Sequence, residues 1–166
     1  MFVVTRMEEE NSNFYKCLEE LKTNFGPSIC PIVVPFDKYG TVESYINLLE
    51  MKAYTYDKDG KPTEVEMPAS ENRLKGLRAA MAEAIAETDE ELMEKFFMEE
   101  PFTEEELMNG IKAGLKQRSV TPVFCGSALE GFGTAELLEG IIAYAPNALE
   151  GLALATEEGG EFVMDA

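Results

Sequence analysis

Apolar residues recur at three- and four-residue steps in several segments of the chain, and this spacing predicts amphipathic helices. The longest such segment runs from Asn72 to Phe97. Shorter helices are predicted over 11–25, 104–117 and 134–144. Gly26 followed by Pro27 is typical of a helix end, and Thr103 with Glu106 has the capping-box spacing of a helix start.

Runs rich in β-branched and aromatic residues predict strands at 2–4, 29–36, 45–56, 63–67 and 120–125. Pro31 and Pro35 cannot donate to a ladder, so the second run is expected to be an edge strand or a strand with frayed ends. Asp57 to Gly60 should turn the third run back on the fourth as a hairpin. This turn resembles the start of a calcium loop but lacks its later Gly and Glu, so an ordinary turn is predicted. The strand, small-residue loop and helix over 120–144 make half of a βαβ unit, which indicates an α/β fold.

The helix predicted over 72–97 carries a second, acidic line almost opposite its apolar face. Gly76, Ala79 and Ala80 begin this line with small residues, and four carboxylates continue it: Glu83, Glu87, Glu90 and Glu94. Thr88 with Glu91 also has capping-box spacing, so Thr88 either marks a break or lies inside one continuous helix. The acidic line is either an ordinary solvent-exposed helix face or a docking surface for a basic partner.

Composition narrows the classes of partner. The formal net charge is −18, from 32 acidic and 14 basic residues, which argues against a surface for free nucleic acid or anionic membranes. No apolar run reaches the length of a membrane span, and the N-terminal apolar residues are too few for a signal peptide, so a cytoplasmic location is expected. Between residues 83 and 106 there are eleven acidic residues and one basic residue, Lys95. This imbalance exceeds what solubility requires.

Residue types exclude several kinds of chemistry. The chain has no His and only three scattered cysteines, so no zinc site, disulfide framework or histidine-based triad is expected, and the cysteines should be free thiols. The phosphate-loop pattern G-x-x-x-x-G-K-[ST] does not occur. Carboxylates are numerous, but no pattern brings two of them into a cleft as a glycosidase requires. No catalytic residue is predicted from the residues alone.

Several segments, taken in order, resemble bacterial elongation factor G, the ribosomal translocation GTPase. They are FVVTRME (2–8), PIVVP (31–35), LLEMKA (48–53), EELMEKF (90–96) and VFCGSA (123–128). The resemblance implies a partial P-loop GTPase-type α/β domain interrupted by an α+β insert. Residues 1–25 and 119–147 then form the rear part of the GTPase domain, 26–118 the insert, and 148–166 a linker or tail. We therefore expect a piece of a longer chain.

The resemblance also implies a guanine pocket. The family's Asn-Lys-x-Asp motif corresponds to Thr5, Arg6, Met7 and Glu8 here. Glu8 retains a carboxylate that accepts two N–H bonds from guanine, and Arg6 can cover the base as the family's Lys does, whereas Thr5 is too short to replace the Asn amide. Ser127 and Ala128 match the family's Ser-Ala loop, where a backbone N–H meets the base oxygen. GTP or GDP is expected in the parent protein, with no cofactor for the fragment alone.

In the same family, the long helix of the insert offers acidic residues to the basic C-terminal domain of the large-subunit ribosomal stalk protein. The alignment through EELMEK places these residues at Glu83, Glu87 and Glu90, with Glu94 continuing the line. The sequence thus predicts part of a translational GTPase that acts on the ribosome. A stand-alone acidic interaction module with no nucleotide function is the alternative.

Overall fold

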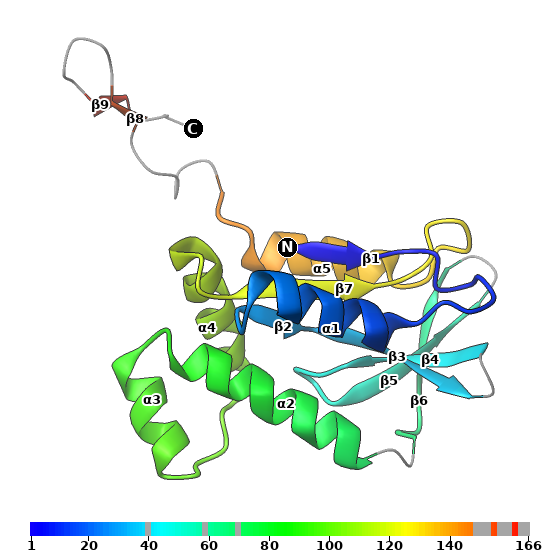
Figure 1. Cartoon of the computed structure of the whole chain (residues 1–166), viewed down its shortest axis with the longest axis horizontal. Coiled ribbons are helices and arrows are strands. Elements are labelled where there is room, and N and C mark those ends of the chain that lie inside the picture. Colours follow the sequence, from blue (N-terminus) through cyan, green and yellow to red (C-terminus); the bar gives the residue numbers. More distant parts are fainter. Residues whose placement is uncertain (39–40, 58–59, 69–70, 148–153, 156–160, 163–166) are drawn as a thin grey trace.

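A three-stranded parallel sheet forms the centre of the computed structural model, which describes residues 1–38, 41–57, 60–68, 71–147, 154–155 and 161–162 (Figure 1). Its strands lie in the order β1 (Phe2–Val4), β7 (Thr121–Cys125) and β2 (Ile29–Pro31). Strand β7 is central although it comes last in sequence, and Val123, Phe124 and Cys125 are almost fully buried. The predicted α/β fold is confirmed.

A four-stranded antiparallel sheet follows directly, in the order β3 (Val33–Lys38), β4 (Thr41–Asn47), β5 (Lys52–Tyr56) and β6 (Pro62–Val65). The single strand predicted over 29–36 is divided between the two sheets at Ile32. Its N–H donates to the Val123 carbonyl of the parallel sheet at 2.8 Å, and its carbonyl accepts from the Leu48 N–H at 2.9 Å. Strands β2 and β3 each lie at a sheet edge, as the two prolines predicted.

The strand predicted over 45–56 is also two strands, because the chain turns between Asn47 and Lys52. The Asn47 side chain accepts the N–H groups of Leu49 and Glu50 at this turn. The expected hairpin between β5 and β6 is present, with Tyr56 opposite Pro62. Residues 58–59 of its turn lie outside the described residues, and no group of three or more potential metal ligands occurs in the part of the chain that is described.

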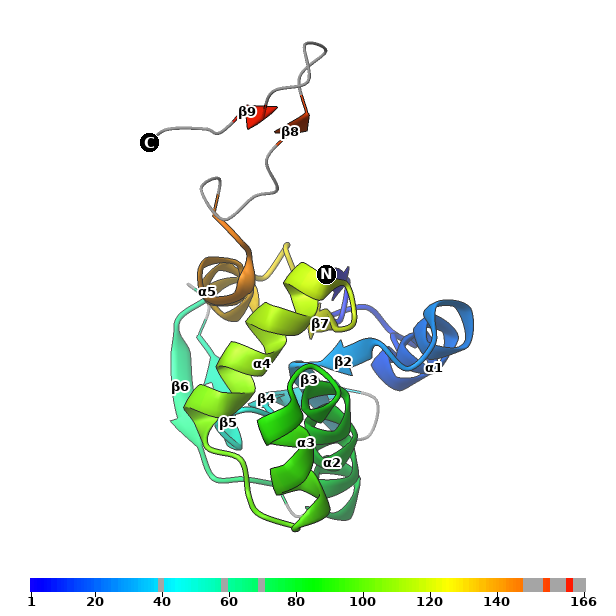
Figure 2. The same cartoon turned by 90° about the vertical axis from the view of Figure 1, so that its left-hand side faces the viewer.

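Helices α1 (Phe14–Phe25), α4 (Glu104–Gln117) and α5 (Thr134–Tyr144) agree with the predicted segments. The Asn13 side chain caps α1, and the predicted capping box of Thr103 and Glu106 opens α4. Figure 2 shows α1 and α5 on opposite sides of the parallel sheet. A Cβ added at Gly140 of α5 would lie 2.4 Å from the Phe124 ring, so this glycine lets the helix approach β7 closely.

The helical segment predicted over 72–97 is two helices, α2 (Glu71–Ala86) and α3 (Glu90–Phe97), so of the two alternatives the break is correct and the continuous helix is wrong. Thr88 marks the break, and its hydroxyl donates to the Ile85 carbonyl at 2.7 Å. Asp89 rather than Thr88 is the N-cap of α3, because its side chain accepts from the first amides of that helix. Local side-chain hydrogen bonding of this kind competes with helix continuation. Ser70, whose residue type suits an N-cap before this segment, lies outside the described residues.

One hydrophobic core links all these elements. Buried residues of α2 and α4, including Leu74, Ile85 and Ile111, join the same cluster as those of the parallel sheet. The predicted boundary at residue 26 stays a prediction, although β2 continues the parallel sheet beyond it. The three cysteines are free, as expected. Beyond α5, β8 (Leu154–Ala155) pairs antiparallel with β9 (Glu161–Phe162). No helix in the described part is long and apolar enough to span a bilayer.

Candidate functional site

The loops that follow β1 and β7 meet at the carboxyl ends of the parallel strands, where α/β folds commonly bind ligands. The Gly126 N–H donates to the Val4 carbonyl at 3.0 Å, and the Met7 N–H donates to the Gly126 carbonyl at 3.4 Å. Arg6 adopts a left-handed conformation with φ of 63°. The two segments predicted to recognise guanine therefore lie side by side.

The loop from Gly126 to Gly133 folds tightly on itself. A Cβ at Gly126 would lie 2.3 Å from the Phe132 carbonyl oxygen, and one at Gly133 would lie 2.3 Å from the Cys125 carbonyl oxygen. Real Cβ atoms do not come so close to backbone atoms, so both positions require glycine. The Ser127 N–H donates to the Phe132 carbonyl at 2.9 Å. This closure is what holds Ser127 in place.

Ser127 and Ala128 have different roles within this loop. Ser127 is 1% exposed, and its hydroxyl accepts the Glu130 N–H at 3.1 Å. Its own amide is already used inside the loop, so it is not available to a ligand. Ala128 is exposed, and among the described residues no backbone group accepts its N–H. Of the two predicted residues, Ala128 therefore has the amide that a ligand oxygen can reach.

Glu8 lies beside Ser127 and is half-buried. A hydrogen bond from the Ser127 hydroxyl, with a further one from its own amide, lowers the pKa of Glu8, so the carboxylate stays charged. Its Oε2 atom is buried and has no hydrogen-bond partner among the described residues. A charged carboxylate at this loop junction suits a ligand that presents N–H groups, as guanine does.

Thr5 and Arg6 lie on the surface. The Arg6 Nε is 3.5 Å from Glu9 Oε1, and the Arg6 side chain is 76% exposed. Of the five residues predicted for the guanine pocket, Glu8, Ser127 and Ala128 are thus brought together at one loop junction, while Thr5 and Arg6 lie at its margin. Sequence reasoning missed Phe132, whose carbonyl closes the loop. The flanking glycines at 131 and 133 were the only signal for it.

We call the exposed surface that carries Glu83, Glu87, Glu90 and Glu94 the acidic surface. It contains a cleft of about 610 Å³ between the end of α1 and the exposed side of α2. Glu83 and Glu87 line it, one helical turn apart, next to small residues. The full lining is Lys22, Gly26, Pro27, Ser28, Ile29, Ala80, Glu83, Ala84, Glu87 and Ser119. The rest of the predicted small-residue face is also open, since a Cβ at Gly76 would meet no atom within 4 Å.

The four predicted carboxylates do not form one line, because the helix break separates them. Glu90 and Glu94 belong to α3 and are absent from the cleft lining. All four are exposed, and none forms an ion pair within the part of the chain that the structure describes. Lys95, the one cation of the acidic segment, is paired with Glu106. The surface therefore keeps uncompensated negative charge.

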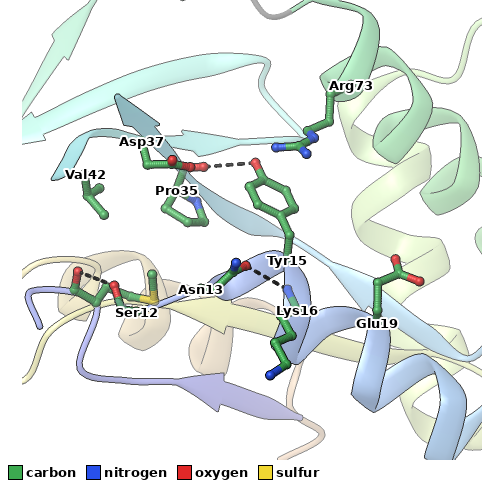
Figure 3. Close-up of a pocket in the computed structure, with 10 residues that line it drawn as sticks. Ser12, Asn13, Tyr15, Lys16, Glu19, Pro35, Asp37, Val42 and Arg73 are labelled. Carbon is green, nitrogen blue, oxygen red and sulfur yellow. Dashed lines mark hydrogen bonds between the residues drawn. The ribbon is translucent and has the colours of Figure 1, made fainter. Parts of the chain in front are cut away.

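A second cleft, of about 440 Å³, lies between α1, the antiparallel sheet and the start of α2 (Figure 3). The Tyr15 hydroxyl donates to the Pro35 carbonyl at 3.0 Å, and the Arg73 guanidinium lies 4.1 Å from the centre of the Tyr15 ring. Burial raises the pKa of Tyr15. The central side chains are thus engaged in contacts between elements, and we assign this cleft no chemistry.

Comparison with known proteins agrees with this architecture. No protein-family model matches the chain. An elongation factor G-like protein of Thermotoga maritima is 38% identical over 160 residues, which are 95% of this chain and 23% of the relative. A crystal structure of a Thermus thermophilus protein matches with a TM-score of 0.79 and 34% identity, covering 90% of this chain and 22% of that one.

The chain is therefore an α/β unit homologous to one segment of a much longer protein. The similarity to an elongation factor G-like protein confirms the resemblance predicted from the sequence. The chain spans about a quarter of the length of these relatives.

Proposed function

We propose that this chain is the base-recognition part of an elongation factor G-like GTPase that acts on the ribosome in the cytoplasm. The observation that carries the proposal is the charged carboxylate of the half-buried Glu8 beside Ser127, at the carboxyl ends of β1 and β7. The homology to an elongation factor G-like protein supports the same conclusion. In the longer protein, GTP binding and hydrolysis would promote translocation.

The proposed chemistry is hydrogen-bond complementarity to guanine. Glu8 accepts the two N–H groups on the Watson–Crick edge of the base, and the Ala128 N–H donates to the base oxygen. Arg6 covers one face of the ring from the margin of the site, and Thr5 adds no amide contact. Adenine would leave the Glu8 carboxylate facing an acceptor, which a buried charged group strongly disfavours. The sequence has no phosphate loop, so hydrolysis needs residues outside this chain.

Nucleotide titration of the full-length protein that contains this chain tests the proposal. Glu8→Gln should weaken GDP binding roughly tenfold or more, because a hydrogen bond to a charged group contributes about 1.5–3 kcal/mol. Xanthosine diphosphate should bind the variant better than the wild type, since the new amide can donate to the extra carbonyl. Glu9→Gln is the matched control and should keep GDP affinity. Equal GDP affinity of wild type and Glu8→Gln in calorimetry would refute the assignment.

We further propose that the acidic surface binds the basic C-terminal domain of the large-subunit stalk protein. Glu83 and Glu87 carry this proposal because they are exposed, lack ion-pair partners among the described residues and line a cleft that also contains small residues and one cation, Lys22. A basic side chain can enter such a cleft closely. Glu90 and Glu94 on α3 extend the negative field around it. The stand-alone acidic module remains the alternative, favoured by the net charge of −18.

Charge-reversal variants distinguish specific binding of the stalk protein from a non-specific effect of net charge. Reversing Glu83, Glu87 and Glu90 to Lys should weaken binding of the stalk protein's C-terminal domain at low salt and leave the fold intact. Three reversals elsewhere, at Glu10, Glu20 and Glu139, change the net charge equally and should have a smaller effect. Equal loss in both triple variants would show a non-specific charge effect. A phosphate loop encoded upstream of Met1 would favour the GTPase over the stand-alone module.

A further inference from the structure

Three aromatic rings connect the antiparallel sheet to the loop that contains Ser127. Tyr45 of β4 and Tyr56 of β5 pack edge to face, with ring centres 5.5 Å apart. Phe132 of the loop completes the cluster, with its ring centre 6.1 Å from that of Tyr45 and 5.6 Å from that of Tyr56. Such pairs favour one relative arrangement of the rings, beyond the effect of burial alone. We call these residues the ring cluster.

A backbone contact joins the same two regions at a second point. The Gly60 end of the β5–β6 hairpin lies against Gly131: a Cβ at Gly60 would be 3.3 Å from the Gly131 oxygen, and one at Gly131 would be 3.4 Å from the Gly60 Cα. Both glycines have positive φ, 73° and 77°. In Figure 1 the loop lies next to this end of the antiparallel sheet. The sheet therefore supports the loop at Phe132 and at the residue before it.

Polar groups gather around the ring cluster. The hydroxyls of Tyr45 and Tyr56 and the Oε2 atoms of Glu8 and Glu136 are buried without a hydrogen-bond partner among the described residues. Burial raises the pKa of Tyr45, and the Glu8 carboxylate is among the charges that add to this shift. Burial and the Glu136 carboxylate raise the pKa of Tyr56. The ring cluster therefore adjoins the carboxylate assigned to the base as well as the loop.

We propose that Tyr45, Tyr56 and Phe132 are positioning residues for guanine recognition, so that the antiparallel sheet serves as a rigid support for the base-binding loop. This inference rests on the proposed function of Glu8 and Ala128. The rings fix Phe132, whose carbonyl accepts the Ser127 N–H at 2.9 Å. That bond keeps the Ser127 hydroxyl beside Glu8 and the exposed Ala128 next to it, whose N–H has no backbone acceptor among the described residues. None of the three rings needs to touch the nucleotide.

Base discrimination in the full-length protein is the first test. Phe132→Ala should weaken GDP binding about tenfold, while ADP binding, which does not use these base contacts, stays unchanged. Phe132→Tyr keeps the ring and should retain GDP affinity. Ile46→Ala removes buried packing from the same sheet without touching a ring, so it should lower the melting temperature yet keep the ratio of GDP to ADP affinity. An unchanged ratio in Phe132→Ala would overturn the proposal.

A double-mutant cycle and hydrogen exchange test the positioning role of Phe132 in two further ways. Because Phe132 and Glu8 are proposed to act through the same contact, Phe132→Ala combined with Glu8→Gln should lose less GDP affinity than the two single losses predict. In the 166-residue chain itself, Phe132→Ala should accelerate exchange of the Ser127 amide; if that variant does not fold, Tyr56→Leu replaces it. Wild-type exchange rates at Ser127 would refute the positioning role. Absence of GDP binding by the wild-type full-length protein would instead refute the proposed function.

Discussion

The loop junction after β1 and β7 and the acidic surface of α2 and α3 place their polar groups in opposite environments. At the junction, Ser127 and one oxygen of Glu8 are buried, and hydrogen bonds and close backbone contacts determine their positions. On the acidic surface, Glu83 and Glu87 face solvent without ion-pair partners among the described residues. The first site therefore depends on atomic packing, whereas the second depends on accumulated charge.

Replacing one phenylalanine by alanine in each region should give the largest difference in the free energy of unfolding. Phe124 of β7 is 1% exposed and Phe97 of α3 is 77% exposed. Phe124→Ala should therefore reduce the free energy of unfolding by about 3–5 kcal/mol, because it removes buried surface and leaves a cavity. Phe97→Ala should change it by less than about 0.5 kcal/mol. Urea unfolding of both variants measures this, and similar losses would contradict the assigned burial.

Replacing one glycine by alanine in each region should give smaller changes in stability, and the two changes should have opposite signs. Gly126→Ala places a Cβ 2.3 Å from the Phe132 oxygen and should destabilise the protein by about 1–3 kcal/mol. Gly76→Ala lies in an exposed helix with no atom within 4 Å and should stabilise it by about 0.5–1 kcal/mol. Thermal unfolding distinguishes the two. A stabilising Gly126→Ala would show that the loop is less tightly closed than described.

Lowering the pH should give the smallest of the predicted changes in stability, and it acts through Glu106 of the acidic segment. The Lys95 ammonium and the Thr103 amide lower the pKa of Glu106 to about 2, below its usual value in an unfolded chain of about 4.3. The charged carboxylate therefore stabilises the fold above about pH 5, and this contribution is lost as the pH falls toward 2. Glu106→Gln should flatten the dependence of the melting temperature on pH over that range. Glu105→Gln, its exposed neighbour, should leave the dependence as in the wild type.

The helices show how far local sequence information reaches. The apolar spacing, Thr103 and the Gly26-Pro27 pair were sufficient to predict α1, α4 and α5 closely, because caps and periodicity act within a few residues. The break between α2 and α3 was left open, since the capping-box spacing of Thr88 and Glu91 fitted a helix start or the interior of one helix. Only the structure shows that Asp89 accepts the first amides of α3.

Local pattern and motif were enough to establish the α/β class and the resemblance to elongation factor G, and to propose residues of the candidate site, because each of these depends on short stretches of sequence. Tertiary packing was needed to show that Ile32 divides one predicted strand between two sheets. The same holds for the contact of Glu8 with Ser127 and for the packing of Tyr45 and Tyr56 against Phe132. These contacts join residues distant in sequence, so no periodicity or spacing encodes them, and only the packing of the two sheets brings them together.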